Sequence, residues 1–442
     1  MLFSPKINIL TQNFLKMKKG LLFLVLLIGA SVLNAQIVFD DYYINKSMRL
    51  DYFHTGNYNE EIYSIDEVIE EPFWGGPSIN LIDNFDYGKF KYNVYDLATN
   101  VLIYSRGYST LFAEWQTTEE ARNTWRTYSE TIVFPFPKKS VKVEFLSRNK
   151  KNLWEKKFEY VIDPSNYFIV KECKHKANVF NVYESGSPTK KLDIVIIPDG
   201  YTKNEMKKFH KDCNRFASYL LNVSPYKEYQ NLINIRAVEA VSSESSTDIP
   251  AENIWKNTAL GTTFYIFGTE RYLMSNDNKT VRDYASNTYY DQIYILVNTE
   301  IYGGGGIYNY YSVCVSDNKY SDYIFIHEFG HGFAGLADEY YTSDVAVEDF
   351  YPFDVEPWEP NITTLVNFDS KWKNLLTPGV PIPTPDIKEN IGKTGVFEGG
   401  GYSAKKIYRP ASDCTMKSIS YNNFCTVCKD AIIKMLKFYS DQ

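Results

Sequence analysis

His327-Glu328-Phe329-Gly330-His331 begins the stretch that decides how this chain is interpreted, and the stretch continues as Gly332-Phe333-Ala334-Gly335-Leu336-Ala337-Asp338-Glu339-Tyr340. On a helix with about 3.6 residues per turn, His327 and His331 project from one face, so both imidazoles can bind one metal ion. Glu328 then lies beside the metal, where its carboxylate can deprotonate a water molecule. The pattern predicts half of a zinc site, with Glu328 as the general base.

The residues around this motif fit a buried helix that ends shortly after it. The four residues before His327, numbered 323–326, are all apolar or aromatic, as expected for a helix behind a cleft. Gly335 is suited to end the helix in the left-handed conformation. Asp338 follows that glycine by three residues, which brings its carboxylate within reach of the same metal.

The third metal ligand needs a separate argument, because no histidine follows His331. The remaining three of the five histidines lie upstream: His54, His175 and His210. Asp338 and Glu339 are the nearest downstream oxygen donors, and a carboxylate is an acceptable third zinc ligand. Cys314, upstream of the motif, is a more distant alternative.

Length and composition indicate an ordinary globular protein of two domains. The chain has 442 residues, of which 44% are hydrophobic, enough for two cores. Its net charge of -7 argues against nucleic acid as a partner, since phosphate binding requires a basic surface. The sequence makes no prediction of the oligomeric state.

The N-terminus has the layout of a secretory signal peptide. Lysines at 16, 18 and 19 precede an apolar run over residues 21–28, followed by small residues up to Ala35. We expect residues 1–35 to be removed, with Met17 as an alternative translation start. The apolar run is too short for stable membrane insertion, so a secreted or periplasmic protein is expected.

Residues 36–165 are predicted to form an all-β antiparallel sandwich. Short alternating runs of aromatic and β-branched residues recur there, at 91–96, 101–104, 131–134 and 141–146. The turn-forming sequence at 163–166 marks the end of this domain.

Residues 166–442 are predicted to form an α/β domain. Residues 192–197 and 233–238 read as buried strands. Between them, Thr202 and Glu205 form a capping box before a helix whose apolar face includes Phe209 and Phe216, which gives a β-α-β unit. Residues 294–297 read as a further buried strand before the metal-binding helix.

Two glycine tracts flank that helix in sequence. Gly303–Gly306 precedes residues 307–313, which we expect to be an edge strand able to pair with an extended peptide. Gly399–Gly401, followed by Tyr402, is expected to form a wall or lid. A flexible surface loop is the alternative for both tracts.

All six cysteines lie within residues 166–442, and three of them cluster near the end of the chain: Cys414, Cys425 and Cys428. In an oxidising compartment this cluster can supply one disulfide. A single CxxC pair is a weak metal signal, so a disulfide or simple burial is the favoured interpretation.

At the metal stretch the chain resembles a metzincin-type zinc endopeptidase, whose motif is HExxHxxGxxH or a variant that ends in Asp. The spacing from Gly335 to Asp338 fits, whereas the spacing from His331 to the glycine is one residue longer. The stretches 327–331, 334–340, 199–202, 413–416 and 424–428 are similar to the IgA-peptidase family of secreted bacterial zinc metalloendopeptidases. Residues 107–115 look like part of the all-β domain that precedes the peptidase domain in bacterial members.

This resemblance implies a multidomain protein with a metzincin-like zincin catalytic domain. It implies that His327, His331 and Asp338 bind Zn²⁺, that Glu328 is the catalytic base, and that Met416 forms a methionine turn beneath the metal. Burial of Met416 as an ordinary core residue is the alternative.

The function expected is that of a secreted zinc metalloendopeptidase acting on protein or peptide substrates. Zinc, two imidazoles and a carboxylate leave a position for water, which Glu328 activates for attack on the scissile carbonyl. One alternative is a secreted glycan- or protein-binding module on an inactive zincin scaffold, although a pure binder needs no base at position 328. Another is hydrolysis of non-peptide amides. Tyr402 and Tyr421 are candidates to stabilise the oxyanion.

Overall fold

The computed structural model describes residues 36–341, 351–419 and 423–440. The predicted signal peptide, residues 1–35, lies outside the described residues. Residues Phe39–Gln442 form one unit, so elements from its beginning and its end are described together. The boundary predicted near residue 165 stays a prediction.

Two antiparallel sheets occupy the N-terminal region. The first has the order β2-β1-β5 and consists of β1 (Tyr43–Gly56), β2 (Glu61–Glu71) and β5 (Arg126–Pro137). The second has the order β4-β3-β6-β7 and consists of β3 (Phe90–Asp96), β4 (Leu102–Tyr108), β6 (Val141–Arg148) and β7 (Trp154–Ile162). This region also contains three short helices: α2 (Phe39–Tyr42), α3 (Leu111–Trp115) and α4 (Glu119–Asn123).

Aromatic side chains hold these two sheets together. The ring of Tyr52 on β1 lies edge-on to that of Phe145 on β6, with centroids 5.0 Å apart. The hydroxyl of Tyr92 on β3 donates a hydrogen bond to the carbonyl oxygen of Val133 on β5 at 2.6 Å. Such ring pairs add to the apolar burial that stabilises the core. The predicted antiparallel β-structure of this region is confirmed.

A six-stranded mixed sheet forms the centre of the second region. Its order is β14-β15-β13-β9-β10-β8, with strands β8 (Val179–Tyr183), β9 (Leu192–Asp199), β10 (Ile233–Val238), β13 (Gln292–Val297), β14 (Gly304–Ile307) and β15 (Tyr311–Val315). The four inner strands are parallel and buried throughout. Burial on both faces explains their nearly continuous apolar sequences, and the predicted α/β character is confirmed.

Helix α5 (Met206–Leu221) connects β9 to its parallel neighbour β10, which gives the predicted β-α-β unit. The capping box is present, and the Glu205 carboxylate accepts a hydrogen bond from the backbone N–H of Thr202 at 2.8 Å. Phe209 and Phe216 are buried, as their helical spacing predicts. The remaining longer helices are α6 (Asn278–Ala285), α7 (Ser321–Ala334) and α8 (Thr426–Tyr439).

Two short pairs complete the described strands: β11 (Thr262–Thr263) with β12 (Met274–Ser275), and β16 (Phe397–Gly400) with β17 (Ser403–Arg409). The second pair contains the later glycine tract. Gly399, Gly400 and Gly401 are buried, so this tract is a structural wall and not a flexible surface loop.

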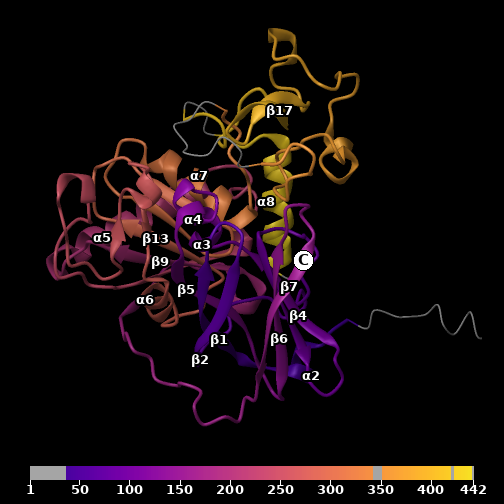
Figure 1. Ribbon diagram of the computed structural model, residues 1–442. Helices are drawn as coiled ribbons and strands as arrows, with labels where there is room; N and C mark the ends of the chain where they lie inside the picture. Colours follow the sequence, from indigo (N-terminus) through magenta and orange to yellow (C-terminus); the bar gives the residue numbers. More distant parts are fainter. Residues whose placement is uncertain (1–35, 342–350, 420–422, 441–442) are drawn as a thin grey trace, which may run out of the picture. The chain divides into compact units, whose positions relative to one another are not determined.

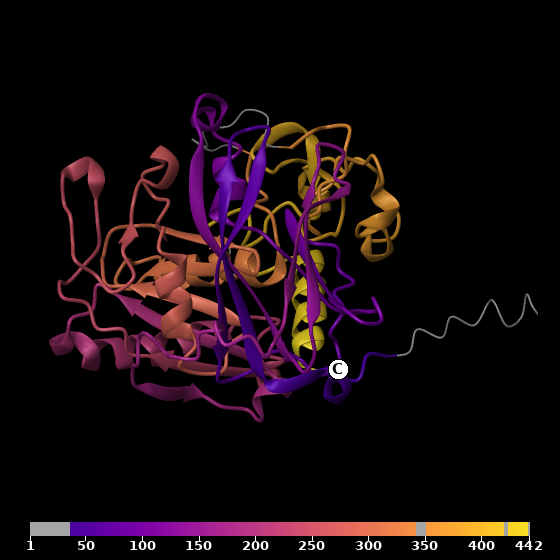
Figure 2. The same ribbon diagram turned by 60° about the horizontal axis from the view of Figure 1, so that its bottom comes forward.

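The N-terminal sheets contact the α/β region through buried charged side chains. Arg49 on β1 is 1% exposed, and its guanidinium donates to Asp283 on α6 at 2.6 Å. On the other sheet, the guanidinium of Arg106 lies 4.4 Å from the ring centroid of Phe438 on α8. Helix α8 runs beside the strands of this sheet in both views (Figure 1 and Figure 2).

The first glycine tract itself forms an edge of the six-stranded sheet. β14 consists largely of this tract, and β15 is the second strand, so the expectation of an edge strand at 307–313 is wrong. Two backbone hydrogen bonds of 3.2 Å also tie this edge at Gly304: its carbonyl oxygen accepts from the Leu273 N–H, and its N–H donates to the Arg271 carbonyl oxygen. Glycine has low strand propensity. Its presence in β14 is explained by the close packing of this strand on α7, because a Cβ at Gly306 would lie 2.2 Å from the Glu328 carbonyl oxygen.

Gly306→Ala is therefore expected to destabilise the protein by about 1–3 kcal/mol, because β14 and α7 must move apart to admit a methyl group. Chemical denaturation checks this change in the free energy of unfolding. Gly186→Ala is the matched control, since the added methyl group would meet only the flexible side chain of Lys191. Equal stability of the two variants would contradict the close packing of β14 on α7.

Candidate metal centre

Helix α7 carries the HExxH motif and packs against the central sheet. Its Phe325 ring lies 5.0 Å from that of Phe216 on α5. The helix ends at Gly335, whose φ of 60° is left-handed. The Gly335 N–H donates to the His331 carbonyl oxygen at 3.1 Å, and the Leu336 N–H donates to that of Gly330 at 3.2 Å. These bonds turn the chain back as the glycine predicts.

The turn brings three potential ligand atoms together. Nε2 of His327 and Nε2 of His331 lie 3.1 Å apart. Oδ1 of Asp338 lies 3.0 Å from the first nitrogen and 3.3 Å from the second. Ligands about 2.0–2.1 Å from a tetrahedral zinc are separated by about 3.3 Å. The three atoms therefore have the spacing of ligands around one small cation.

The other ring nitrogens determine which atoms face this point. Nδ1–H of His327 donates to the Thr415 carbonyl oxygen at 3.0 Å, and Nδ1–H of His331 donates to that of Leu336 at 2.5 Å. In a neutral imidazole the opposite nitrogen then carries a lone pair. Two lone pairs and a buried carboxylate, with Asp338 5% exposed, repel one another unless a cation or proton lies between them.

Electrostatics of the protein without a metal lead to the same conclusion. Burial opposes charge on His331, but the neighbouring Asp338 carboxylate outweighs it and raises the pKa of His331 to about 9. Burial likewise disfavours the charged form of Asp338, yet His331 and His327 hold its pKa well below the usual range. The three side chains therefore favour a positive charge between them, and their nitrogen and oxygen donors are suited to a metal ion.

Glu328 lies one residue after the first histidine and is half-buried. Burial raises the pKa of its carboxyl group, and the charges of His327 and His331 act in the opposite direction. Its side chain packs against β14, where a Cβ on Gly304 would lie 3.2 Å from Glu328 Cγ. The carboxylate is thus a relatively basic group held beside the two imidazoles.

Met416 lies against the underside of α7. It is fully buried, at 0% exposure, and a Cβ on Gly330 would lie 2.8 Å from its sulfur. Its carbonyl oxygen accepts a hydrogen bond from the Glu339 N–H at 2.8 Å. The preceding residue, Thr415, supplies the carbonyl that orients His327. The chain at 415–416 thus forms a floor for both the helix and the ligand loop.

Two family models match this chain, and together they cover most of the described residues. The model of the family described as IgA Peptidase M64 matches residues 180–394 and 386–436, and the model described as Peptidase M64 N-terminus matches residues 38–159. The chain belongs to the IgA peptidase M64 family. Membership implies a hydrolase of peptide bonds. A comparison with curated proteins gave no match.

In this M64 peptidase, His54 and Cys314 do not belong to the three-ligand group. His54 is fully buried and bonded by both nitrogens to Glu130 and Glu61. Cys314 is buried on β15, and its thiol donates to the carbonyl oxygen of Ser321, the first residue of α7, at 3.5 Å. The structure also separates the two candidate third ligands. Asp338 joins the histidines, whereas Glu339 joins a different group of side chains.

Tyr402 lies beside the candidate centre, and its predicted part in stabilising the oxyanion stays a prediction. Its hydroxyl donates a hydrogen bond to Oδ2 of Asp338, so it orients the carboxylate that faces the histidines. The Gly401 N–H, next to it, donates to the Asp338 carbonyl oxygen at 2.9 Å. Tyr421, the second oxyanion candidate, lies outside the described residues.

Removal of the Tyr402 hydroxyl is expected to weaken metal binding. Tyr402→Phe should lower the zinc affinity of the histidine site by about 10- to 100-fold, as is typical when an orienting partner of a ligand is lost. Competition with a chromophoric chelator measures this affinity. Tyr167→Phe, at a tyrosine that is 86% exposed, is the control. An unchanged affinity in Tyr402→Phe would show that the hydroxyl does not position Asp338.

The N-terminal region contributes a carboxylate that sequence reasoning did not identify. Glu114 on α3 accepts a hydrogen bond from the hydroxyl of Tyr272. Burial raises the pKa of Glu114 to about 7, with His331 lowering it and Glu328 raising it. Glu114 therefore lies close enough to the candidate centre for the charges of His331 and Glu328 to act on it. It lies within residues 107–115, which no sequence spacing links to the HExxH motif.

Among the described residues, none of the helices has both the length and the apolar character that a membrane span requires.

Proposed function

We propose that this peptidase is a secreted, zinc-dependent endopeptidase. His327, His331 and Asp338 hold the metal ion, and Glu328 is the general base. The observation that supports this proposal is the convergence of two imidazole lone pairs and one buried carboxylate at separations of 3.0–3.3 Å. The three-residue sequence spacing from Gly335 to Asp338 and the position of Met416 against α7 fit a metzincin-like zincin.

The side chains of the centre divide the chemistry between them. Zinc, when bound, supplies a Lewis acid that polarises the scissile carbonyl group. Glu328 accepts a proton from the attacking water and afterwards donates it to the leaving amine. The raised pKa of Glu328, caused by burial, makes its carboxylate a better proton acceptor near neutral pH. Thr415, Leu336 and Tyr402 fix the three ligands through hydrogen bonds.

The N-terminal sequence supports the proposed location of this activity. A basic segment, an apolar run and Ala35 at the expected cleavage site support export from the cytoplasm by a cleaved signal peptide. The mature protein would begin at Gln36 and act on proteins or peptides in the periplasm or outside the cell. N-terminal sequencing of the exported protein tests this proposal, and an uncleaved N-terminus contradicts it.

Digestion of unfolded casein tests the enzymatic proposal directly. We expect cleavage at internal peptide bonds, loss of cleavage with a chelator, and recovery on addition of Zn²⁺. Cleavage that persists in the chelator-treated, metal-depleted protein would contradict a metal mechanism. Binding of casein without cleavage by the zinc-loaded protein would favour the alternative of a secreted binding module on an inactive scaffold.

A further inference from the structure

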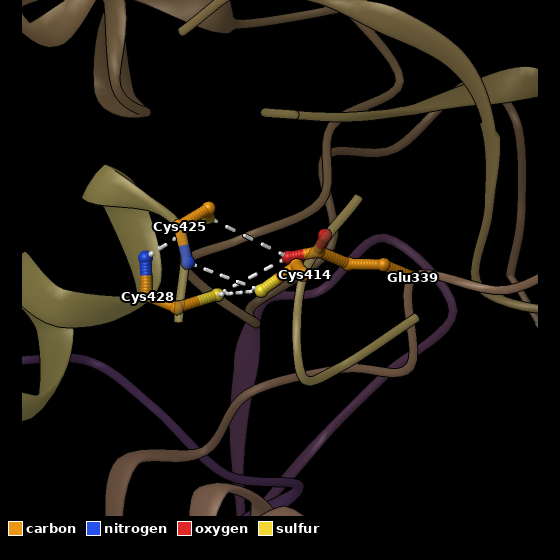
Figure 3. A group of neighbouring side chains, drawn as sticks. All are labelled: Glu339, Cys414, Cys425 and Cys428. Carbon is orange, nitrogen blue, oxygen red and sulfur yellow. Dashed lines mark hydrogen bonds between the residues drawn. The ribbon is translucent and has the colours of Figure 1, made fainter. Parts of the chain in front are cut away.

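A second group of potential metal ligands lies next to the first. It consists of Glu339, Cys414, Cys425 and Cys428, and we call it the cysteine cluster (Figure 3). One potential ligand atom from each of the four residues lies within 4.8 Å of all the others. The group combines three distant parts of the chain: the loop after α7, the segment before Met416, and the first turn of α8.

The distances within the cysteine cluster match a metal site better than a disulfide. The sulfurs of Cys414 and Cys428 lie 3.8 Å apart. Zn–S bonds of about 2.3 Å at tetrahedral angles place two sulfurs about 3.8 Å apart, whereas a disulfide requires about 2.05 Å. Oε1 of Glu339 lies 3.1 Å from the Cys428 sulfur and 4.0 Å from that of Cys425. These values bracket the distance of about 3.5 Å expected between oxygen and sulfur ligands of one zinc.

Backbone N–H groups around the cluster point toward the sulfurs. The Cys425 N–H donates to the Cys414 sulfur at 3.2 Å, and the Cys428 N–H donates to the Cys425 sulfur at 3.5 Å. Cys425 is the N-cap residue of α8, so the positive end of the helix dipole faces the group. Hydrogen bonds to sulfur and a helix N-terminus both stabilise a thiolate over a thiol. Thiolate is the form that binds metal.

Glu339 supplies the strongest sign that this cluster binds a cation. Its side chain is 0% exposed, and Oε2 has no hydrogen-bond partner. Asn361 donates to Oε1 at 3.0 Å and fixes the orientation of the carboxylate. A buried carboxylate with an unsatisfied oxygen is costly unless a cation compensates it. One disulfide or simple burial of the thiols would leave this oxygen unsatisfied.

We propose that Glu339, Cys414, Cys425 and Cys428 bind a second zinc ion in a closed structural site. Four protein ligands leave no position for a water molecule, which is the arrangement of structural zinc sites. The proposal revises the favoured interpretation of these cysteines from sequence. All six cysteines lie in the described part of the chain, and none of them forms a disulfide.

This second site would hold the first one in place. Glu339 directly follows the ligand Asp338, and Cys414 directly precedes Thr415, whose carbonyl orients His327. The Glu339 N–H also donates to the Met416 carbonyl oxygen at 2.8 Å. A metal bound to Glu339 and Cys414 therefore fixes both the ligand loop and the floor residues to α8. The role of such a zinc is positioning and not catalysis.

Metal content and sulfur coordination test the proposal independently of activity. We expect about two zinc ions per chain in the purified protein. A His327→Ala/His331→Ala double variant should keep one of them, and X-ray absorption of that variant should show Zn–S distances of about 2.3 Å. A zinc-free double variant, or one whose zinc has no sulfur ligands, would overturn the proposal. Failure of the proposed peptidase activity would leave this result unaffected.

Alkylation of the unaltered protein provides a second measurement that needs no cluster variant to fold. We expect the three cluster cysteines to react with iodoacetamide under native conditions only after a chelator has removed the metal. The Cys414→Ser/Cys428→Ser double variant should lose one zinc ion, and Cys213→Ser, at a fully buried cysteine outside the cluster, should lose none. A cluster disulfide detected by mass spectrometry, or equal zinc contents of these two variants, would overturn the proposal.

Discussion

Glu328→Gln is expected to lower the rate of peptide hydrolysis by about 100- to 10,000-fold, the range typical of a lost general base. The amide has nearly the same size as the carboxylate but cannot accept the proton of the attacking water. None of the three candidate metal ligands is altered, so the zinc content should stay at its original value. Steady-state cleavage of a fluorogenic peptide, together with elemental analysis, measures both quantities on one preparation.

The predicted loss should appear in kcat more than in KM, because the base acts on the transition state and contributes little to substrate binding. Glu119→Gln is the matched control, since its side chain is 80% exposed on α4. An active Glu328→Gln enzyme would remove the assignment of Glu328 as the base. A zinc-depleted variant would instead mean that Glu328 takes part in holding the metal.

The local part of the metal centre was predictable from sequence. His327 and His331 lie on one helix, and Gly335 ends it. Both the common direction of the two imidazoles and the end of the helix follow from short-range backbone geometry. The parallel strands of the α/β region were equally readable, since burial on both faces leaves a continuous apolar run. These features require no knowledge of distant contacts.

The assignment of Asp338 and Glu339 to different groups was not accessible in this way. Both carboxylates lie in reach of the histidines by sequence spacing. The structure separates them through distant partners, because Gly401 bonds the Asp338 carbonyl oxygen and Met416 bonds the Glu339 N–H. For the same reason the CxxC pair appeared to lack further ligands. Its carboxylate partner lies 89 residues from Cys428 in the sequence.

Asp338→Ala is expected to empty the histidine site and abolish hydrolysis. It removes a direct ligand, so the zinc affinity of this site should fall by more than the 10- to 100-fold expected for loss of an orienting partner. Elemental analysis after dialysis against a weak chelator should show the loss of one zinc ion. X-ray absorption should show that the remaining zinc is bound by sulfur.

Glu339→Ala is the matched comparison, because it removes the neighbouring carboxylate from the same loop. If Glu339 is a ligand of the second zinc, this variant should lose the sulfur-bound zinc and retain the metal bound to the histidine nitrogens. The two variants thus have opposite spectroscopic signatures even where both lose activity. Loss of the nitrogen-bound metal in Glu339→Ala but not in Asp338→Ala would reverse the assignment of the third ligand. The Asp338 carboxylate lies 3.0 Å and 3.3 Å from the two histidine nitrogens, which favours Asp338 as the third ligand.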